Sequence, residues 1–197
     1  MNLPEYKGPA EIESQKYDRN TRINKIQIDM TERCIELCEI SKDHLILDLG
    51  CGSGISGCVL SQYEYIWIGT DISHSMLKIC KNKEFAFDLC RSDIGTNFCF
   101  KKNTFDKIIS VSVLQWLFHS YSSTHEPFLR INIFFQNLFF VLKNHGQAVL
   151  QFYPENSKQT DIFIKVARKA GFQGGLVIDN EGTKNKKYFL VLRVFKQ

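Results

Sequence analysis

The stretch LDLGCGSG, residues 47–54, decides the fold because it joins an apolar run to a glycine-rich turn. HLILDLG, which includes the apolar run, is typical of a short buried strand, and ISGCVLSQY after the turn indicates a helix. Gly50, Gly52 and Gly54 fall at the junction, where glycine permits positive φ angles and lets a ligand touch the backbone. A helix that begins there offers unpaired N–H groups. The pattern predicts a ligand-binding strand–turn–helix unit, and the alternative is a plain tight turn.

Strand-like and helix-like segments alternate outward from this turn, which predicts an α/β domain. The expected strands are 44–49, 65–73, 84–93, 104–113, 147–153, 174–180 and 186–195, and the expected helices are 22–40, 55–63, 74–82, about 127–143 and 157–170. No helix separates the last two strands, so we expect them to be antiparallel. The fold class is therefore a mostly parallel seven-stranded sheet with an antiparallel last strand and helices on both faces. Residues 1–22 are expected to form an N-terminal arm, and residues 23–197 one domain.

Composition excludes several classes of protein. The chain has 25 Lys and Arg against 21 Asp and Glu, a net charge of +4, which argues against a polycationic tail but allows local basic patches. The longest apolar runs are too short to span a membrane, and residues 1–20 lack the apolar core of a signal peptide. The seven cysteines form no CxxC pair, so no metal site is expected. We expect a soluble intracellular protein with no membrane partner.

Two acidic residues follow the next two strands and indicate what the glycine turn binds. Asp71 ends the second strand, where a carboxylate can accept hydrogen bonds from both hydroxyls of a ribose. Asp93 follows the third strand, where it is placed to accept a hydrogen bond from the amino group of adenine. Carboxyl ends of adjacent parallel strands meet at one crevice, so these residues predict a nucleotide-type cofactor. The alternatives are a helix cap for Asp71, with Ser73 as its competitor, and a solvated turn for Asp93.

The spacing of the glycines separates two classes of cofactor. A dinucleotide-binding turn has the pattern G-x-G-x-x-G, whose third glycine would fall at Ile55, whereas this chain has G-x-G-x-G. The spacing, the antiparallel finish and the position of Asp93 favour S-adenosylmethionine. In these features the chain resembles the class I S-adenosylmethionine-dependent methyltransferases. The resemblance implies cofactor contacts from Asp48, Gly50, Cys51, Gly52, Asp71, Ile72, Met76, Asp93, Ile94, Ser110 and Gln115.

The segment SVSVLQWLFH, after the fourth strand, narrows the choice of methyl acceptor. Methyltransferases of nucleobase amino groups commonly have an Asp/Asn-Pro-Pro-aromatic motif here, and this segment contains no carboxylate. No Cys, Lys or His has a spacing that marks it as a general base; His119 and His125 are nearby, and lone histidines are more often structural. A ring nitrogen such as guanine N7 loses no proton on methylation. Such a reaction depends on positioning more than on acid–base catalysis.

The stretch QFYPEN at the end of the fifth strand supplies flat rings for that positioning. Trp116, Phe152 and Tyr153 leave neighbouring strand ends beside the expected methyl group, where rings can stack on a base. Pro154 restricts Tyr153 to extended geometry, and Asn156 is placed to hold the polar edge of the base. These five residues are the candidate catalytic positions. Packing of Trp116 on the core is the alternative, and the choice between Phe152 and Tyr153 is open.

Several blocks of the chain are similar to the eukaryotic small-subunit (18S-type) ribosomal RNA guanine-N7 methyltransferases. The blocks are PEYKGPAEIE, LDLGCGSGISGCVLS, SVSVLQWL, AVLQFYPEN and KAGFQGGLVIDN. QFYPEN and GGLVID are more specific than the glycine turn. The resemblance covers nearly the whole chain and implies that residues 23–197 transfer a methyl group from S-adenosylmethionine to N7 of a guanine during small-subunit biogenesis. The alternatives are a small-molecule or protein methyltransferase, and an assembly factor whose catalysis is dispensable.

The resemblance also implies partners. In this fold the third strand lies at an edge of the sheet, and the apolar positions in Glu84–Cys90 and Phe98–Phe100 invite another chain to add a strand. The implied partner is the small zinc-binding activator subunit shared by several methyltransferases, in a heterodimer. The alternative is that the N-terminal helix covers these rings. The implied substrate is small-subunit rRNA or a pre-ribosomal particle.

Basic residues and the end of the sequence bear on RNA contact and location. Members of the family usually continue into a Lys- and Arg-rich tail associated with nuclear entry, and this sequence ends at Gln197 before such a tail. We expect localisation in the nucleus (nucleolus) and cytoplasm. RNA contact is expected from Lys101, Lys102, residues 184–187, Arg19, Arg22 and Lys25; a solvated charged surface is the alternative.

Overall fold

The computed structural model describes residues 21–83, 88–119 and 126–196. The seven strands within these segments form one sheet in the order β3-β2-β1-β4-β5-β7-β6. Their bounds are β1 Leu45–Leu49, β2 Ile66–Asp71, β3 Asp88–Arg91, β4 Phe105–Val111, β5 Leu142–Phe152, β6 Gln173–Asp179 and β7 Lys187–Arg193. The pairs from β3 to β5 are parallel, and β7 is antiparallel to both β5 and β6. The predicted sheet, with its single reversed strand, is confirmed.

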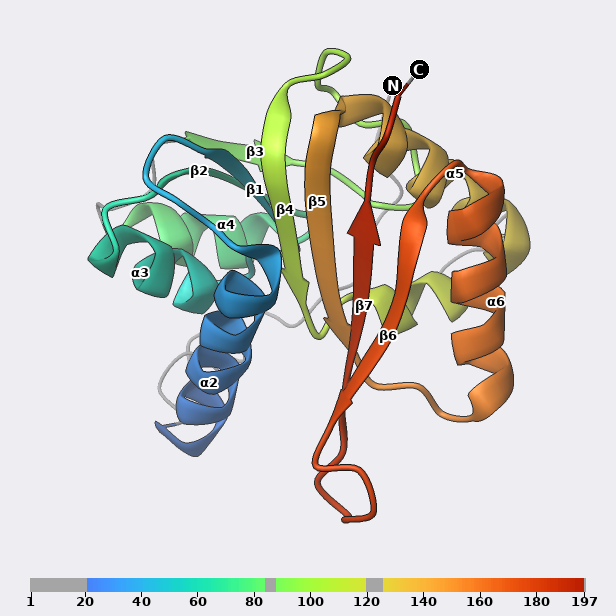
Figure 1. Ribbon diagram of the computed structural model, residues 1–197. Helices are drawn as coiled ribbons and strands as arrows, with labels where there is room; N and C mark the ends of the chain where they lie inside the picture. Colours follow the sequence, from blue (N-terminus) through green and yellow to red (C-terminus); the bar gives the residue numbers. More distant parts are fainter. Residues whose placement is uncertain (1–20, 84–87, 120–125, 197) are drawn as a thin grey trace.

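Helices cover both faces of this sheet (Figure 1). One layer contains α2 (Thr21–Cys38), α3 (Ile55–Gln62) and α4 (His74–Lys81), and the other contains α5 (Pro127–Val141) and α6 (Ser157–Lys169). A short 3-10 helix, η1 (Leu114–Phe118), follows β4. Among the described residues, no helix is both long enough and apolar enough to cross a membrane.

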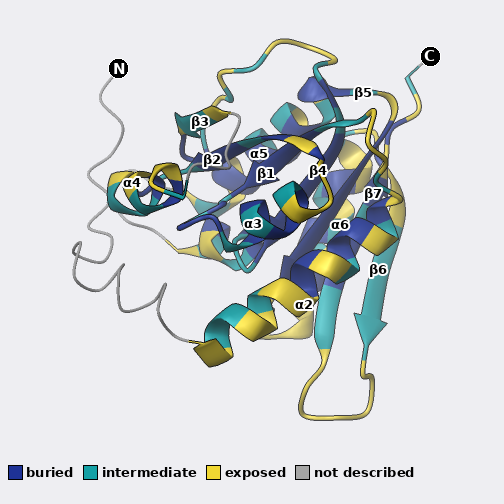
Figure 2. Cartoon of the chain, turned by 90° about the vertical axis from the view of Figure 1, so that its left-hand side faces the viewer, coloured by how far each residue is buried: buried dark blue, intermediate teal, exposed yellow. Residues whose placement is uncertain are grey.

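The strands are buried because alternate residues face opposite helix layers. Ile109 and Val149 pack with α2 and α3, whereas their neighbours Ile108 and Leu150 pack with α5 and α6. Figure 2 shows the central strands as a buried layer beneath helices that expose only their outer faces. The cysteines of α2, Cys34 and Cys38, are buried in the first layer, where they pack as small core residues.

The structure changes the start of the first expected helix and of the fifth expected strand, and two expected segments lie partly outside the described residues. The first described helix begins at Thr21, and the preceding residues 1–20 of the expected arm lie outside the described part of the chain, as do residues 84–87 of the third strand. β5 begins at Leu142, earlier than the expected residue 147, because pairing with β4 continues through a register shift between Phe105 and Lys107. The carboxyl ends of the parallel strands nevertheless lie within about two residues of the predicted ends.

Candidate functional site

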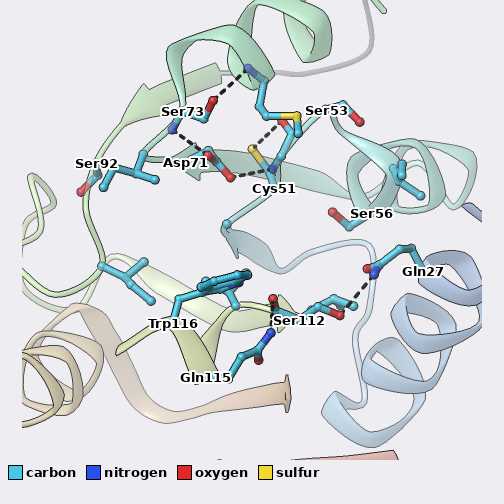
Figure 3. A pocket seen from close by; sticks show the side chains of 18 of the residues that line it. Gln27, Cys51, Ser53, Ser56, Asp71, Ser73, Ser92, Ser112, Gln115 and Trp116 are labelled. Atoms are coloured by element: carbon cyan, nitrogen blue, oxygen red, sulfur yellow. Dashed lines mark hydrogen bonds between the residues drawn. The ribbon is translucent and has the colours of Figure 1, made fainter. Parts of the chain in front are cut away.

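A cleft of about 600 Å³ opens at the carboxyl ends of β1, β2 and β4. Its two halves meet at the glycine turn, and Figure 3 shows them as opposite walls. One half is lined by Asp71, Ile72, Ser73, Met76, Ser92, Asp93, Ile94 and Arg130. The other half is lined by Gln27, Val111, Ser112, Val113, Gln115, Trp116 and Tyr153. We call the first the nucleoside half and the second the acceptor half.

The glycine turn is held against β2 by its own backbone. The N–H groups of Gly50 and Cys51 both donate to the carbonyl oxygen of Thr70, at 2.7 and 2.9 Å. Gly50, Gly52 and Gly54 all have positive φ, at 76°, 54° and 86°. A Cβ added at Gly50 would lie 2.2 Å from Val113 Cγ2, whereas a Cβ at Gly52 would meet no atom within 4 Å. The turn is therefore tightly packed at Gly50 and open at Gly52, so a ligand can approach the backbone there.

The carboxylate of Asp71 is fixed by two backbone N–H groups. Oδ2 accepts from Gly52 N at 2.9 Å, and Oδ1 accepts from Ser73 N at 2.8 Å. Burial raises the pKa of Asp71, and these hydrogen bonds oppose the shift. Ser73 rather than Asp71 caps α4, because its Oγ accepts from Met76 N. Each oxygen of Asp71 has lone-pair capacity left for a ligand.

Asp93 has a partner that sequence reasoning missed. Arg130 of α5 donates from Nη1 to Asp93 Oδ2 at 2.8 Å and from Nη2 to Oδ1 at 2.9 Å. Both side chains are buried, and Oδ1 also accepts from Gly95 N at 2.8 Å. Within the described part of the chain, Arg130 Nε has no hydrogen-bond partner. Arg130 is the single charged residue in the mostly apolar start of α5, PFLRINIFF, and this is the signal that could have identified it.

Two predicted cofactor residues do not line the cleft, and these expectations are corrected. Asp48 is buried below the turn and accepts a hydrogen bond from Ser56 Oγ at 2.5 Å. Burial raises the pKa of Asp48 to about 7. Ser110 is also buried, and its Oγ donates to Leu49 O at 2.7 Å. Both residues lie within strands, before the chain reaches the sheet edge where the cleft opens.

Two of the three aromatic rings that were expected to stack on a base line the cleft. Trp116 and Tyr153 line the cleft with exposures of 49% and 40%. Phe152 is fully buried and packs edge-on against Phe163 of α6, with ring centroids 5.3 Å apart. The prediction of Phe152 as a base contact is therefore wrong, because successive residues of a strand face opposite sides.

The rest of QFYPEN begins the next helix. Asn156 is the N-cap of α6, and its Oδ1 accepts from Gln159 N at 3.2 Å. Neither Asn156 nor Pro154 is among the residues that line the cleft. We therefore correct the expectation that Asn156 holds the polar edge of a base: its side chain caps a helix instead.

Contacts on both sides hold the Tyr153 ring. The hydroxyl donates to Met30 Sδ at 3.5 Å and accepts from Lys187 Nζ at 3.3 Å. The ammonium group of Lys187 also lies 5.3 Å from the ring centroid, within the range of a cation–π interaction. Residues near both ends of the described chain therefore position this ring.

The acceptor half is polar but contains no general base. Among the described residues, those that line it include no carboxylate, lysine or histidine. His119 lies outside the lining, with its ring 5.2 Å from that of Trp116. Across the described segments, no group of three or more His, Cys, Asp or Glu side chains could hold a metal ion. The arrangement suits a reaction that requires positioning and no proton transfer.

The sheet order and the cleft define a class I S-adenosylmethionine-dependent methyltransferase. A family model described as a methyltransferase domain matches residues 47–150. A TehB-like S-adenosylmethionine-dependent methyltransferase from Corynebacterium glutamicum has a similar solved structure, with a TM-score of 0.68 and 20% identity over 95% of this chain and all of that one. The methyltransferase solved in complex with the Trm112 activator of Haloferax volcanii has a TM-score of 0.64 and 14% identity, over 93% of this chain and 98% of that one. At these identities the likeness concerns the fold alone.

Sequence relatives define the family more narrowly. The 18S rRNA (guanine-N7)-methyltransferase bud23 of Schizosaccharomyces pombe is 43% identical over 98% of this chain and 75% of its own length. The 18S rRNA (guanine(1575)-N7)-methyltransferase of Saccharomyces cerevisiae is 44% identical over 93% of this chain and 69% of its own length. The chain belongs to this family of 18S rRNA (guanine-N7)-methyltransferases.

Proposed function

We propose that this chain transfers the methyl group of S-adenosylmethionine to N7 of a guanine in small-subunit ribosomal RNA. Relatives at 43% and 44% identity carry this activity in their names. The structural observation that carries the proposal is the composition of the acceptor half. Two exposed rings line it, and among the described residues its lining includes no carboxylate, lysine or histidine that could act as a general base. N7 has an in-plane lone pair and needs no deprotonation, so this surface suits it.

The nucleoside half fits the proposed cofactor. The open backbone at Gly52 and the spare lone pairs of Asp71 suit the methionine part and the ribose hydroxyls. Asp93 and Arg130 line this half, where an adenine ring would lie, and the ion pair between them fixes the position of the Asp93 carboxylate. The remaining residues proposed to hold the cofactor are Gly50, Cys51, Ile72, Met76, Ile94 and Gln115.

When bound, S-adenosylmethionine supplies a methyl group on a sulfonium: the bond to N7 forms as the bond to sulfur breaks, and positive charge moves onto the purine. Trp116 and Tyr153 hold the plane of the base by stacking. Lys187 and Met30 keep the Tyr153 ring in place. These residues act by orientation, and the second candidate function, a ribosome-assembly factor with dispensable catalysis, would not require them.

The test is transfer of labelled methyl groups to unmodified small-subunit rRNA or pre-ribosomal particles, followed by cleavage chemistry specific for N7-methylguanosine. We expect one strong cleavage position. Label in protein or in a small molecule, with none in rRNA, would reject the proposal. Asp71→Ala should weaken binding of S-adenosylhomocysteine, and unchanged binding would remove Asp71 from the ribose site.

The edge strand β3 is the proposed docking site for a small zinc-binding activator subunit. β3 ends the sheet and pairs with β2 alone among the described strands, so its outer backbone groups are available to an added strand. A methyltransferase of the same fold has been solved in complex with the Trm112 activator of Haloferax volcanii. The described part of α2 packs mainly against β4, α3 and β5.

The docking surface is narrower than the sequence predicts. Phe98 and Phe100 pack inward, where their rings meet Phe134 and Phe105 at centroid distances of 6.2 and 4.9 Å. Both rings are half-buried, so the apolar surface that they offer a partner is smaller than expected. Glu84–Phe87 lie outside the described residues, so the proposal rests on the backbone of β3.

The β6–β7 hairpin and the start of α2 are the proposed RNA contacts. Both project beyond the same end of the sheet in Figures 1 and 2. The exposed basic residues there are Arg22, Lys25, Lys184 and Lys186, which suit a phosphate backbone. Lys101 and Lys102 precede β4, at the opposite end of the sheet from the cleft, so they are removed from this set. Arg19 lies outside the described residues. An rRNA substrate supports the proposed location in the nucleus (nucleolus) and cytoplasm.

A further inference from the structure

A network of amide side chains lies beside the acceptor half of the cleft. Gln151 of β5 is fully buried, and Ser112 follows β4 with a φ of 63°. Gln27 reaches Ser112 from α2, across 85 positions of sequence. Gln115 reaches it from η1. Which group donates and which accepts in each hydrogen bond of this network determines which side-chain atoms remain to face the cleft.

The amide of Gln151 determines which groups donate and which accept where it meets Ser112. Its Nε2 donates to the carbonyl oxygen of Phe152 at 3.2 Å, which is an acceptor only. Its Oε1 therefore faces Ser112, where it accepts from the backbone N–H at 2.9 Å and lies 3.1 Å from Oγ. An amide oxygen has no proton to give, so the hydroxyl proton of Ser112 points at Gln151.

This direction fixes the amide of Gln27. Ser112 Oγ has a single proton, which is already donated, so its 3.2 Å contact with Gln27 must be a hydrogen bond from Nε2 to Oγ. Gln27 Oε1 is consequently turned away from Ser112. Among the described residues, the hydrogen bond of the Gln27 amide is the one from Nε2 to Ser112, and the side chain lines the cleft (Figure 3). The amide oxygen of Gln27 is therefore held in a set orientation in the acceptor half of the cleft.

Gln115 points the same way. Its Nε2 donates to the carbonyl oxygen of Ser112 at 2.7 Å, and its Oε1 accepts only a long 3.4 Å hydrogen bond from Tyr153 N. Gln27 and Gln115 thus both direct their N–H groups at Ser112. Each Nε2 keeps a second N–H, and the hydrogen-bond acceptor that each of these two residues offers a ligand is its amide oxygen.

We propose that Gln27 is a specificity-determining residue that selects guanine, with Oε1 accepting a hydrogen bond from the N1–H or 2-amino group. This inference rests on the proposed function. Guanine presents these two donors on its Watson–Crick edge, which single-stranded RNA exposes for recognition. Adenine has an acceptor at N1 and no 2-amino group, so it would face Gln27 Oε1 with a second acceptor. Two acceptors that face each other without water make no hydrogen bond, and the free-energy cost of this disfavours binding of adenine.

The test is a double-mutant cycle between the protein and the base. The substrate is an rRNA fragment that the wild-type chain methylates, prepared with guanosine, inosine or 1-methylguanosine at the target. Inosine lacks the 2-amino group, and 1-methylguanosine lacks the N1 proton. For wild type, we expect at least one analogue to lower kcat/KM by about tenfold. For Gln27→Leu, we expect kcat/KM on guanosine to fall by a similar factor, with no further loss on that analogue.

Two further variants separate recognition from folding. Ser112→Gly keeps the positive φ but removes the hydroxyl that orients Gln27, and should lower the preference for guanosine. Asp29→Asn, an exposed change on the same helix, should behave as wild type. All variants should bind S-adenosylhomocysteine as wild type does. The role of Gln27 would be overturned if the fall in kcat/KM caused by Gln27→Leu and the fall caused by the analogue multiplied when the two were combined. Full activity of Gln27→Leu on guanosine would overturn it as well. Absence of N7-methylguanosine with wild type would instead reject the proposed function.

Discussion

At the scale of single residues, two adjacent aromatic residues at the end of β5 have different roles: one packs in the core and the other is proposed to contact the base. Phe152 faces α6 and is fully buried, whereas Tyr153 faces the cleft and is 40% exposed. The sequence contains two adjacent rings, and only the orientation of the strand assigns them to different tasks. The two rings therefore respond differently to truncation.

Tyr153→Ala should reduce methyl transfer while leaving cofactor affinity and stability close to wild type. Stacking of a base on an aromatic ring contributes about 1–3 kcal/mol, so kcat/KM on rRNA should fall by roughly tenfold or more. Tyr153→Phe keeps the ring and should retain most activity. Phe152→Ala, in contrast, should cost about 3–5 kcal/mol of stability, as large buried aromatic truncations do. Urea unfolding and single-turnover transfer check both, and equal destabilisation by Tyr153→Ala and Phe152→Ala would contradict this assignment.

Arg130 shows how one buried charge depends on another. Its guanidinium neutralises Asp93 in a buried pair with two hydrogen bonds. Removing one partner of such a pair leaves an uncompensated charge, at a cost of about 3–5 kcal/mol. Arg130→Met should therefore lower the free energy of unfolding in urea by about that amount. The double variant with Asp93→Asn should recover part of the loss, and a purely additive double variant would show that the two side chains are not coupled.

At the scale of elements, β3 offers an unpaired edge whose backbone directions are known. Ser92 N donates to Asp71 O, so by the two-residue period of a strand Cys90 N also faces β2, while the N–H groups of Leu89 and Arg91 point outward. Leu89 N donates to the side chain of Asp88. The N–H of Arg91 is thus the outward donor best placed for an added strand.

Arg91→Pro should abolish binding of the activator subunit while preserving the sheet, because proline removes that donor at an edge position where it is tolerated. Arg91→Ala is the matched control, since it removes the same side chain but keeps the N–H. The measurement is co-purification after co-expression with the activator. Equal recovery of the activator with both variants would exclude strand addition at this position.

The local pattern of the sequence is sufficient to predict the helices and strands, but it does not predict the side-chain contacts between them. Strand and helix alternation predicted the sheet, and G-x-G-x-G with Asp71 predicted the turn and its carboxylate. Arg130 lies 37 residues from its partner Asp93, and Gln27 lies 85 residues from Ser112, so no local periodicity reveals either pair. Asp48 was misplaced for a related reason: residues near the turn alternate between the cleft and the interior, and spacing alone does not say which is which.

At the scale of the whole molecule, the buried carboxylate of Asp48 makes stability depend on pH. Its pKa is raised to about 7 by burial, whereas an aspartate in an unfolded chain has a pKa of about 3.9. Between these values the folded state holds a proton that the unfolded state releases. The free energy of unfolding should therefore fall as pH rises from about 4 to about 7 and level off above. The raised pKa of Asp71 acts in the same direction.

Asp48→Asn should flatten this dependence, since asparagine does not titrate and can still accept the hydrogen bond from Ser56. The contribution removed is at most about 4 kcal/mol, from about 1.4 kcal/mol for each unit of pKa shift. Urea unfolding of both proteins at pH 5 and pH 8 provides the measurement. The drop in stability between the two pH values should be smaller in the variant, and identical drops would place the titration elsewhere.

The two halves of the cleft also draw on different lengths of the chain. The side chains of the nucleoside half extend no further than Arg130, whereas Tyr153 in the acceptor half is held by Lys187, at the start of the strand that completes the sheet. During synthesis from the amino end, the residues that line the nucleoside half leave the ribosome before Lys187, which supports the base-stacking ring. The residues proposed to hold the methyl donor are therefore synthesised before the residue that supports the base-stacking ring.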